Sequence, residues 1–131
     1  MRKRILCLDF DGVIHAYTSG WQGAATIPDP PVPGAIEFLR AAVEHFSVAV
    51  FSSRSHQPGG IAAMRAWLAE WAARELPPGA DLAFLEQLVW PLEKPLAFVT
   101  LDDRALTFTG EWPSLEALQA FRPWYQLRAQ E

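Results

Sequence analysis

Three short apolar runs, each ending in polar or acidic residues, constrain the fold of this chain more than any other feature. They cover residues 4–9, 47–51 and 96–101. A short continuous apolar run is typical of a strand that a parallel sheet buries on both faces. We expect a further short strand near 87–90 and a last edge strand at 106–108.

Between these runs, apolar residues recur at the spacing of a helix, which places them on one helical face. The two stripes consist of Ile36, Leu39, Val43 and Phe46, and of Ile61, Met64, Leu68 and Trp71. Pro33 is well placed to open the first helix, and the Pro-Pro-Gly sequence at 77–79 ends the second. A third helix is expected over 114–121, with a polar tail after it.

Alternating strands and helices predict right-handed βαβ units. The expected fold is therefore α/β: a single Rossmann-like domain over residues 1–131, with a mainly parallel sheet and helices on both faces. After the first strand, two β-prone pieces at 13–17 and 24–27 flank Ser19-Gly20-Trp21. This pattern predicts a hairpin that projects from the end of that strand.

Charge and cysteine content limit the partners and the compartment. The net charge is −4, and Arg2-Lys3-Arg4 is the one basic block, so the large basic surface that long nucleic acids require is not expected. A lone cysteine, Cys7, fits a reducing compartment. Asp9 ends the N-terminal apolar run too early for a signal peptide, and no stretch is long and apolar enough to span a membrane. We expect a cytoplasmic protein with no membrane partner and no obligate protein partner.

Polar clusters follow the expected strands. The first strand ends in Asp9-Phe10-Asp11-Gly12, the second in Ser52-Ser53-Arg54 and a later one in Asp102-Asp103-Arg104, and Lys94 lies shortly before that last strand. Ligands of open α/β sheets bind beyond the carboxyl ends of the strands. We therefore expect these four clusters to converge at one edge of the sheet.

Asp9 and Asp11 are two positions apart, which in extended chain puts both carboxylates on the same side, roughly 6–7 Å apart. Clustered acids repel one another unless a cation lies between them, and Mg²⁺ prefers carboxylate oxygens, backbone carbonyls and phosphate. The alternative for the Asp-x-Asp-Gly sequence is a plain turn or helix cap. Taken singly, Lys94 could be an exposed lysine, Ser52 a turn-capping residue and Arg54 a surface ion-pair partner.

In this order, the clusters resemble the signature of the haloacid dehalogenase (HAD) superfamily of phosphatases. Asp9-Phe10-Asp11-Gly12-Val13 is similar to the first motif, Ser52 to the second, Lys94-Pro95 to the third and Asp102-Asp103 to the fourth. The resemblance implies a Mg²⁺-dependent phosphomonoester hydrolase.

The resemblance also implies a role for each matching residue. Asp9 would attack phosphorus and form an aspartyl-phosphate, and Asp11 would act as general acid and then base. Ser52 and Lys94 would bind the phosphoryl oxygens. The Mg²⁺ ligands would be Asp9, the Asp11 backbone carbonyl and one of Asp102 and Asp103, a choice that the sequence leaves open.

The family's mobile flap would cover residues 12–26, with His15, Tyr17 and Trp21 on it. We expect His15 and Trp21 to contact substrate, with packing inside the hairpin as the alternative. Ser53 and Arg54 are further expected substrate contacts, and the planar guanidinium suits bidentate phosphate binding.

The spacing of the motifs leaves no room for a cap domain, because 41 positions separate Asp11 from Ser52 and 42 separate Ser52 from Lys94. Among capless members, the chain looks most similar to the 3′-phosphatase domain of phage-type polynucleotide kinase-phosphatases. Ser52-x-Arg54, Met64-x-x-Trp67 and Asp102-Asp103-Arg104 carry that likeness.

The expected substrate is therefore bulky, such as a nucleic-acid or nucleotide 3′-phosphate. The alternatives are a small-metabolite phosphatase, a phosphotransferase that passes the phosphoryl group to an acceptor other than water, and a phosphate-binding module without catalysis.

Overall fold

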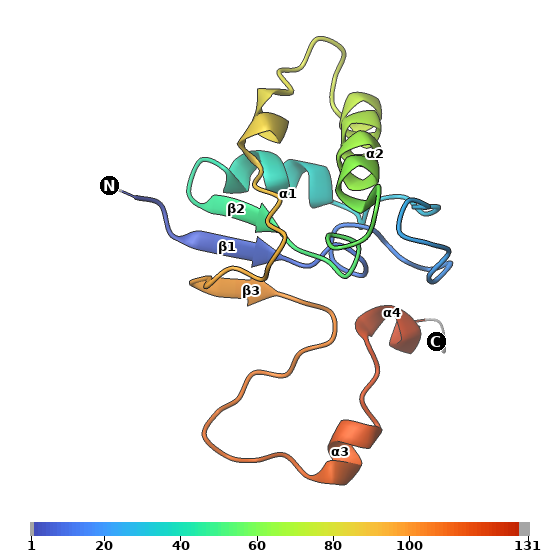
Figure 1. Cartoon of the computed structure of the whole chain (residues 1–131), viewed down its shortest axis with the longest axis vertical. Helices are drawn as coiled ribbons and strands as arrows, with labels where there is room; N and C mark the ends of the chain where they lie inside the picture. Colours follow the sequence, from blue (N-terminus) through green and yellow to red (C-terminus); the bar gives the residue numbers. More distant parts are fainter. Residues whose placement is uncertain (1, 129–131) are drawn as a thin grey trace.

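The computed structural model describes residues 2–128 and has a small parallel sheet at its centre (Figure 1). Its three strands are β1 (Ile5–Leu8), β2 (Ser47–Val50) and β3 (Val99–Leu101), and they lie in the order β2-β1-β3. Both neighbouring pairs are parallel, with Leu8 opposite Val50 on one side and opposite Leu101 on the other. The three apolar runs thus form the predicted parallel strands of an α/β fold.

Two longer helices pack together beside the sheet. They are α1 (Ala35–Ala42) and α2 (Gly60–Glu75), and α1 also contacts the short 3₁₀ helix η1 (Ala83–Gln87). Their buried faces hold half of the residues of the two expected stripes, namely Ile36, Leu39, Met64 and Leu68. The helices bury these side chains against β1 and β2, whose central residues are almost inaccessible to solvent.

The expectation of helices on both faces of the sheet is wrong in the described part of the chain. The connection that follows η1, residues 88–98, is irregular, and it crosses the sheet to reach β3 (Figure 1). Leu8 and Val50 face the helices, so their strand neighbours Cys7 and Ala49 point to the opposite face of the sheet. Both of these residues are small and buried. A face of small side chains can be covered by extended chain, because no bulky residue holds that chain away.

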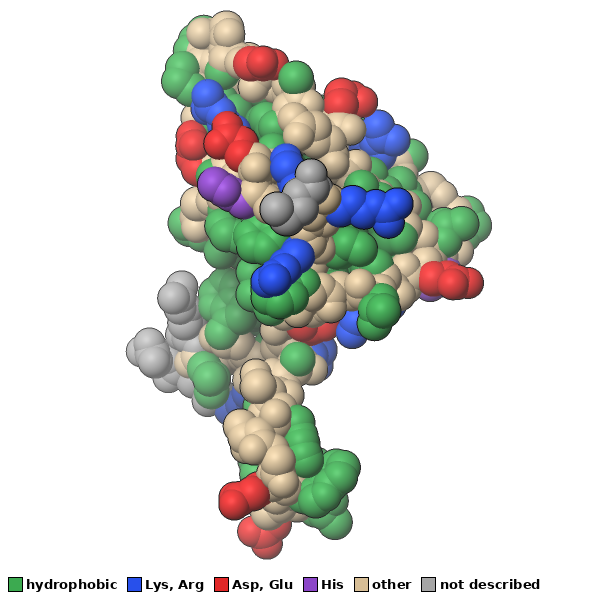
Figure 2. Space-filling view, turned by 90° about the vertical axis from the view of Figure 1, so that its left-hand side faces the viewer, with side chains coloured by type: hydrophobic (Ala, Val, Ile, Leu, Met, Phe, Trp, Pro, Cys, Tyr) green, Lys and Arg blue, Asp and Glu red, His purple; other side chains and the backbone are tan. Residues whose placement is uncertain are grey.

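Two expected strands are not formed. Near 87–90, a single parallel bridge joins Val89 to Ala49, and 106–108 is irregular and exposed. The helix expected over 114–121 is shorter, as α3 (Leu115–Gln119), and the tail contains α4 (Trp124–Arg128). Residues 104–120 form an arm with exposed side chains, and the arm projects from the body with apolar side chains along it (Figures 1 and 2).

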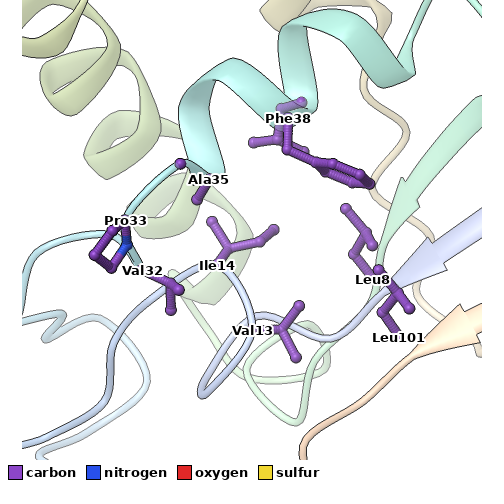
Figure 3. Close-up of a pocket in the computed structure, with 10 residues that line it drawn as sticks. Leu8, Val13, Ile14, Val32, Pro33, Ala35, Phe38 and Leu101 are labelled. Carbon is purple, nitrogen blue, oxygen red and sulfur yellow. The ribbon is translucent and has the colours of Figure 1, made fainter.

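An apolar hollow of about 330 Å³ lies between α1 and the edge strand β3 (Figure 3). Phe38 of α1 and Leu101 of β3 border the hollow, and both are more than two-fifths exposed. Its lining residues are all apolar, so the hollow has no group for acid–base or metal chemistry.

Gly60 at the start of α2 is required by a close approach of two backbones. A Cβ atom there would lie 1.9 Å from the carbonyl oxygen of Arg54. We expect Gly60→Ala to destabilise the protein by about 1–3 kcal/mol, the usual effect of overpacking, although alanine is the better helix former. Urea denaturation measures the change.

The control is Ala62→Gly at an exposed position of the same helix. This change measures the ordinary difference in helix propensity, about 1 kcal/mol in favour of alanine. A Gly60→Ala variant that gains stability by that amount would show that the backbones do not approach closely.

Candidate active site

The carboxyl ends of β1 and β3 bring three aspartates together. Asp9 directly follows β1, and its backbone N–H donates to the Leu101 carbonyl at 3.0 Å, which extends the pairing by one residue. Asp102 and Asp103 directly follow β3. One carboxylate oxygen from each of Asp9, Asp102 and Asp103 lies within 4.8 Å of the other two. The sheet edge therefore gathers these acids as their positions after the strands predict.

The acid cluster has little positive charge beside it: the ion pair that reaches it in the described residues is a long one, from Arg104 Nε to Asp103 Oδ2 at 4.0 Å. Burial, a hydrogen-bonding contact with the Asp103 side chain and the negative charge of Asp102 raise the pKa of Asp9 to about 8. The Phe10 backbone N–H donates to Asp9 Oδ1 at 2.8 Å and opposes that rise only in part. Asp103 Oδ1 is buried, and no donor reaches it from the residues that the structure describes. Close carboxylates with an unpartnered oxygen fit a hard divalent cation such as Mg²⁺.

Asp11 stands apart from that cluster because it has a cation of its own. The Arg54 Nε donates to both Asp11 oxygens, at 2.9 and 3.2 Å. His15 Nδ1 lies 2.9 Å from Asp11 Oδ1, and His15 Nε2 accepts the Asp29 backbone N–H at 3.1 Å. Since Nε2 is an acceptor, the ring proton is on Nδ1 and donates to Asp11. The Asp11 carboxylate is thereby fixed in place from two sides.

Arg54 is fully buried and organises the flap. Its Nη1 donates to the carbonyls of Gly23, Ala24 and Thr26 at 2.9–3.0 Å. The Trp21 ring covers the guanidinium, with its centroid 4.8 Å from Arg54 Cζ. The predicted flap hairpin is wrong, since residues 12–28 contain no strand pair and fold as turns. Carbonyls that a hairpin would pair with backbone N–H groups take their hydrogen bonds from Arg54 instead.

The structure buries two of the expected substrate contacts and packs the third, Trp21, on one of them, with Trp21 still 45% exposed. Arg54 and His15 are 0% exposed and hold Asp11, whereas Trp21 packs on Arg54. This is the packing alternative for the two flap residues. Arg54 has its Nε and Nη1 in use, while Nη2 is buried without a partner among the described residues.

The other expected site residues lie around the same edge. Ser52 is buried at the end of β2, where its Oγ accepts the Arg54 backbone N–H at 3.1 Å, and Ser53 is exposed beside it. Lys94 is exposed and makes no ion pair within 4.0 Å in residues 2–128. Burial raises the pKa of the Cys7 thiol and the positive charge of Lys94 partly offsets the rise, so Lys94 lies close to β1.

The C-terminal helix α4 reaches this edge, which no sequence pattern had indicated. The Tyr125 hydroxyl donates to Asp103 Oδ2 at 2.9 Å, and the Trp124 indole N–H donates to the Gly12 carbonyl at 2.7 Å. Burial and the contact with Asp103 raise the pKa of Tyr125 to about 12, so its hydroxyl remains a donor. The adjacent aromatic pair directly after Pro123 is the available signal, and the prediction of a polar tail over this segment misses it.

Comparison of the chain with protein-family models, with curated proteins and with solved structures finds no match. Within residues 2–128, no helix has the length and apolar character needed to cross a membrane.

The raised pKa of Asp9 predicts how the stability of the metal-free protein depends on pH. Its ordinary pKa is 3.8 and the folded value is about 8, so the folded state binds more protons between these values. The stabilisation is complete below about pH 4 and is lost as the pH rises through about 8. We expect the melting temperature in EDTA to fall over this range and Mg²⁺ to restore it at pH 8.

Asp9→Asn is the matched variant, because the amide cannot ionise and its oxygen can still accept the Phe10 N–H. We expect the variant to have a flatter profile and to gain little from Mg²⁺. Circular dichroism melts at several pH values measure both proteins. Equal slopes for the two would contradict the assignment of this pH dependence to Asp9.

Proposed function

We propose that this protein is a Mg²⁺-dependent phosphomonoester hydrolase that works through an aspartyl-phosphate at Asp9. One observation carries the proposal: Asp9, Asp102 and Asp103 converge with an unpartnered buried oxygen, beside an Asp11 held by Arg54 and His15. Paired strand-end acids with these two distinct environments suit a metal-assisted nucleophile and a separate proton carrier. The ordered motifs that resemble HAD phosphatases support the same assignment.

The cation would be held by the side chains of Asp9, Asp102 and Asp103 together with the Asp11 backbone carbonyl. Bound Mg²⁺ offsets the repulsion between a carboxylate nucleophile and a phosphate dianion. Asp9 attacks phosphorus as the bond from phosphorus to the leaving oxygen breaks. Water then cleaves the aspartyl-phosphate and frees Asp9.

Asp11 is the proton carrier in this scheme. It gives a proton to the leaving oxygen in the first step and takes one from the attacking water in the second. Arg54 and His15 keep its carboxylate at the end of β1 throughout, so they are positioning residues. Ser52 and Lys94 supply hydroxyl and ammonium donors for the phosphoryl oxygens, with Ser53 exposed next to them.

The decisive experiment is Asp9→Asn with an alkyl phosphate and an aryl phosphate as substrates. Loss of the nucleophile should lower kcat at least about 10³-fold for both. The control is Asp81→Asn, because Asp81 is an exposed residue that caps the start of η1. In the wild type, beryllium fluoride with Mg²⁺ should bind against Asp9, which a crystal structure would show.

Residual turnover of Asp9→Asn near the wild-type rate would exclude Asp9 as nucleophile. Full wild-type activity in EDTA would exclude the cation. Ca²⁺ should replace Mg²⁺ poorly, since its larger and more variable coordination misplaces the attacking carboxylate.

For the substrate, we propose a bulky phosphate ester such as a nucleotide or nucleic-acid 3′-phosphate. A hollow of about 350 Å³ adjoins Asp103 and is lined by aromatic rings and by Arg104, among other residues. Tyr17 and Tyr125 line it with aromatic rings that pack edge to face, 5.9 Å apart, and the Arg104 guanidinium, largely exposed, offers charge to a second phosphate. These residues take the place of Arg54 and Trp21 as the expected contacts to the body of the substrate.

Arg104→Gln tests this choice by removing the positive charge. We expect kcat/KM to fall about tenfold for a nucleoside 3′,5′-bisphosphate, the loss typical of one charge-assisted hydrogen bond. For p-nitrophenyl phosphate, which has one anionic group, the change should be less than twofold. Equal losses for the two substrates would remove Arg104 from recognition of the second phosphate.

A further inference from the structure

The contact between Tyr125 and Asp103 divides the roles of the two Asp103 oxygens. Oδ2 accepts the Tyr125 hydroxyl at 2.9 Å, and the same hydroxyl lies 3.4 Å from Arg104 Nη2. Oδ1 is left buried and unpartnered within the described residues, and one of the two Asp103 oxygens lies in the cluster with Asp9 and Asp102. The Asp103 side chain is 2% exposed, so solvent does not hold it in this orientation. The tyrosine hydroxyl is the hydrogen-bond donor that fixes Oδ2, and Arg104 Nε lies 4.0 Å from the same oxygen.

Gly12 shows how closely α4 packs on the site. Its φ is +81°, and a Cβ there would lie 2.4 Å from Asp103 Oδ2 and 2.7 Å from Tyr125 Cε1. Its carbonyl accepts the Trp124 indole N–H at 2.7 Å. The loop after Asp11, the acid after β3 and the C-terminal helix therefore meet at van der Waals distance.

Apart from the contact of Arg104 with the Tyr125 hydroxyl, the arm that connects β3 to α4 contributes little to this docking. Side chains from 104 to 120 are exposed, and residues such as Trp112 are as much as 88% accessible. A helix of five residues, such as α4, is not stable by itself in water. The position of α4 therefore depends on its own contacts with the site, chiefly those of Trp124 and Tyr125.

We propose that α4 is a latch on the site and that Tyr125 is a positioning residue that orients Asp103 toward the cation. The inference deepens the proposed function, on which it rests for the presence of a cation. Docked α4 holds Asp103 beside Asp9 and Asp102 with its Oδ1 free of donors, and a bound cation holds Asp103 where Tyr125 can reach it. The two events are coupled, and by linkage each strengthens the other to the same extent. Partners that orient a metal ligand typically change metal affinity by 10- to 100-fold.

Tyr125→Phe tests the proposal because it removes one oxygen and keeps the ring packed against Gly12 and Tyr17. Mn²⁺, used as the probe cation, should bind roughly tenfold more weakly to this variant in a titration followed by electron paramagnetic resonance. Leu127→Ala, at an exposed position of the same helix, should leave the affinity unchanged. Trp124→Phe, which removes the donor to Gly12, should also weaken binding.

Hydrogen exchange supplies a readout independent of turnover. In the full-length wild type, Mg²⁺ should slow exchange in the peptide that covers residues 122–128, and Tyr125→Phe should reduce that effect. At saturating Mg²⁺, kcat of Tyr125→Phe should approach the wild-type value. If the hydroxyl took part in the chemistry, kcat would stay low at any Mg²⁺ concentration.

Three outcomes separate this proposal from the proposed function. Equal Mn²⁺ affinities for the wild type and Tyr125→Phe overturn the latch, whatever the activity. Weaker binding by Tyr125→Phe in a protein that hydrolyses no phosphomonoester supports the latch and overturns the phosphatase. A wild type that binds neither Mn²⁺ nor Mg²⁺ overturns both.

Discussion

The buried guanidinium of Arg54 is the group on which the rest of the site depends. It joins the end of β2 to Asp11 after β1 and to three flap carbonyls. A buried charge is costly unless it is paired and hydrogen-bonded, and these contacts meet most of that requirement. The flap has one antiparallel bridge, between His15 and Pro31, and no strand pair within it, and Arg54 is the common donor to three of its carbonyls. Removal of Asp11 would leave Arg54 buried without its counter-ion, and the flap would be disturbed together with the chemistry.

This pairing sorts the acids of the sheet edge into two kinds. Asp11 is neutralised inside the protein, whereas no comparable partner neutralises the cluster of Asp9, Asp102 and Asp103 in the described residues. An external cation would consequently bind most favourably at this cluster. The raised pKa of Asp9 has the same cause, an excess of negative charge among buried carboxylates. An enzyme that needs a metal-assisted nucleophile beside a positioned proton carrier can obtain both from neighbouring carboxylates, because their environments differ.

Sequence patterns predicted the parts of the fold that depend on local burial. The apolar runs became β1, β2 and β3, and the stripes became α1 and α2, because a run or stripe of this length can be buried in few ways. The prediction of a flap hairpin was wrong because the β-prone residues carry no information about Arg54, the donor to the flap carbonyls, which lies 28–31 positions away. Residues 106–108 have apolar side chains suited to a strand, but the structure offers them no neighbouring strand.

The same limit explains which site residues were found. Residues that follow strands could be placed at one edge, because parallel strands end together, and Asp9, Asp102 and Asp103 do meet there. Contacts between distant segments outside the strands could not be predicted in this way. One example is the hydrogen bond from Trp124 to Gly12, which joins residues 112 positions apart. Gly12 has no Cβ, and the room that this leaves is taken by Asp103 and Tyr125. A glycine in a motif of this kind therefore does not by itself locate substrate, because the chain's own C-terminal helix can occupy the space that the glycine opens.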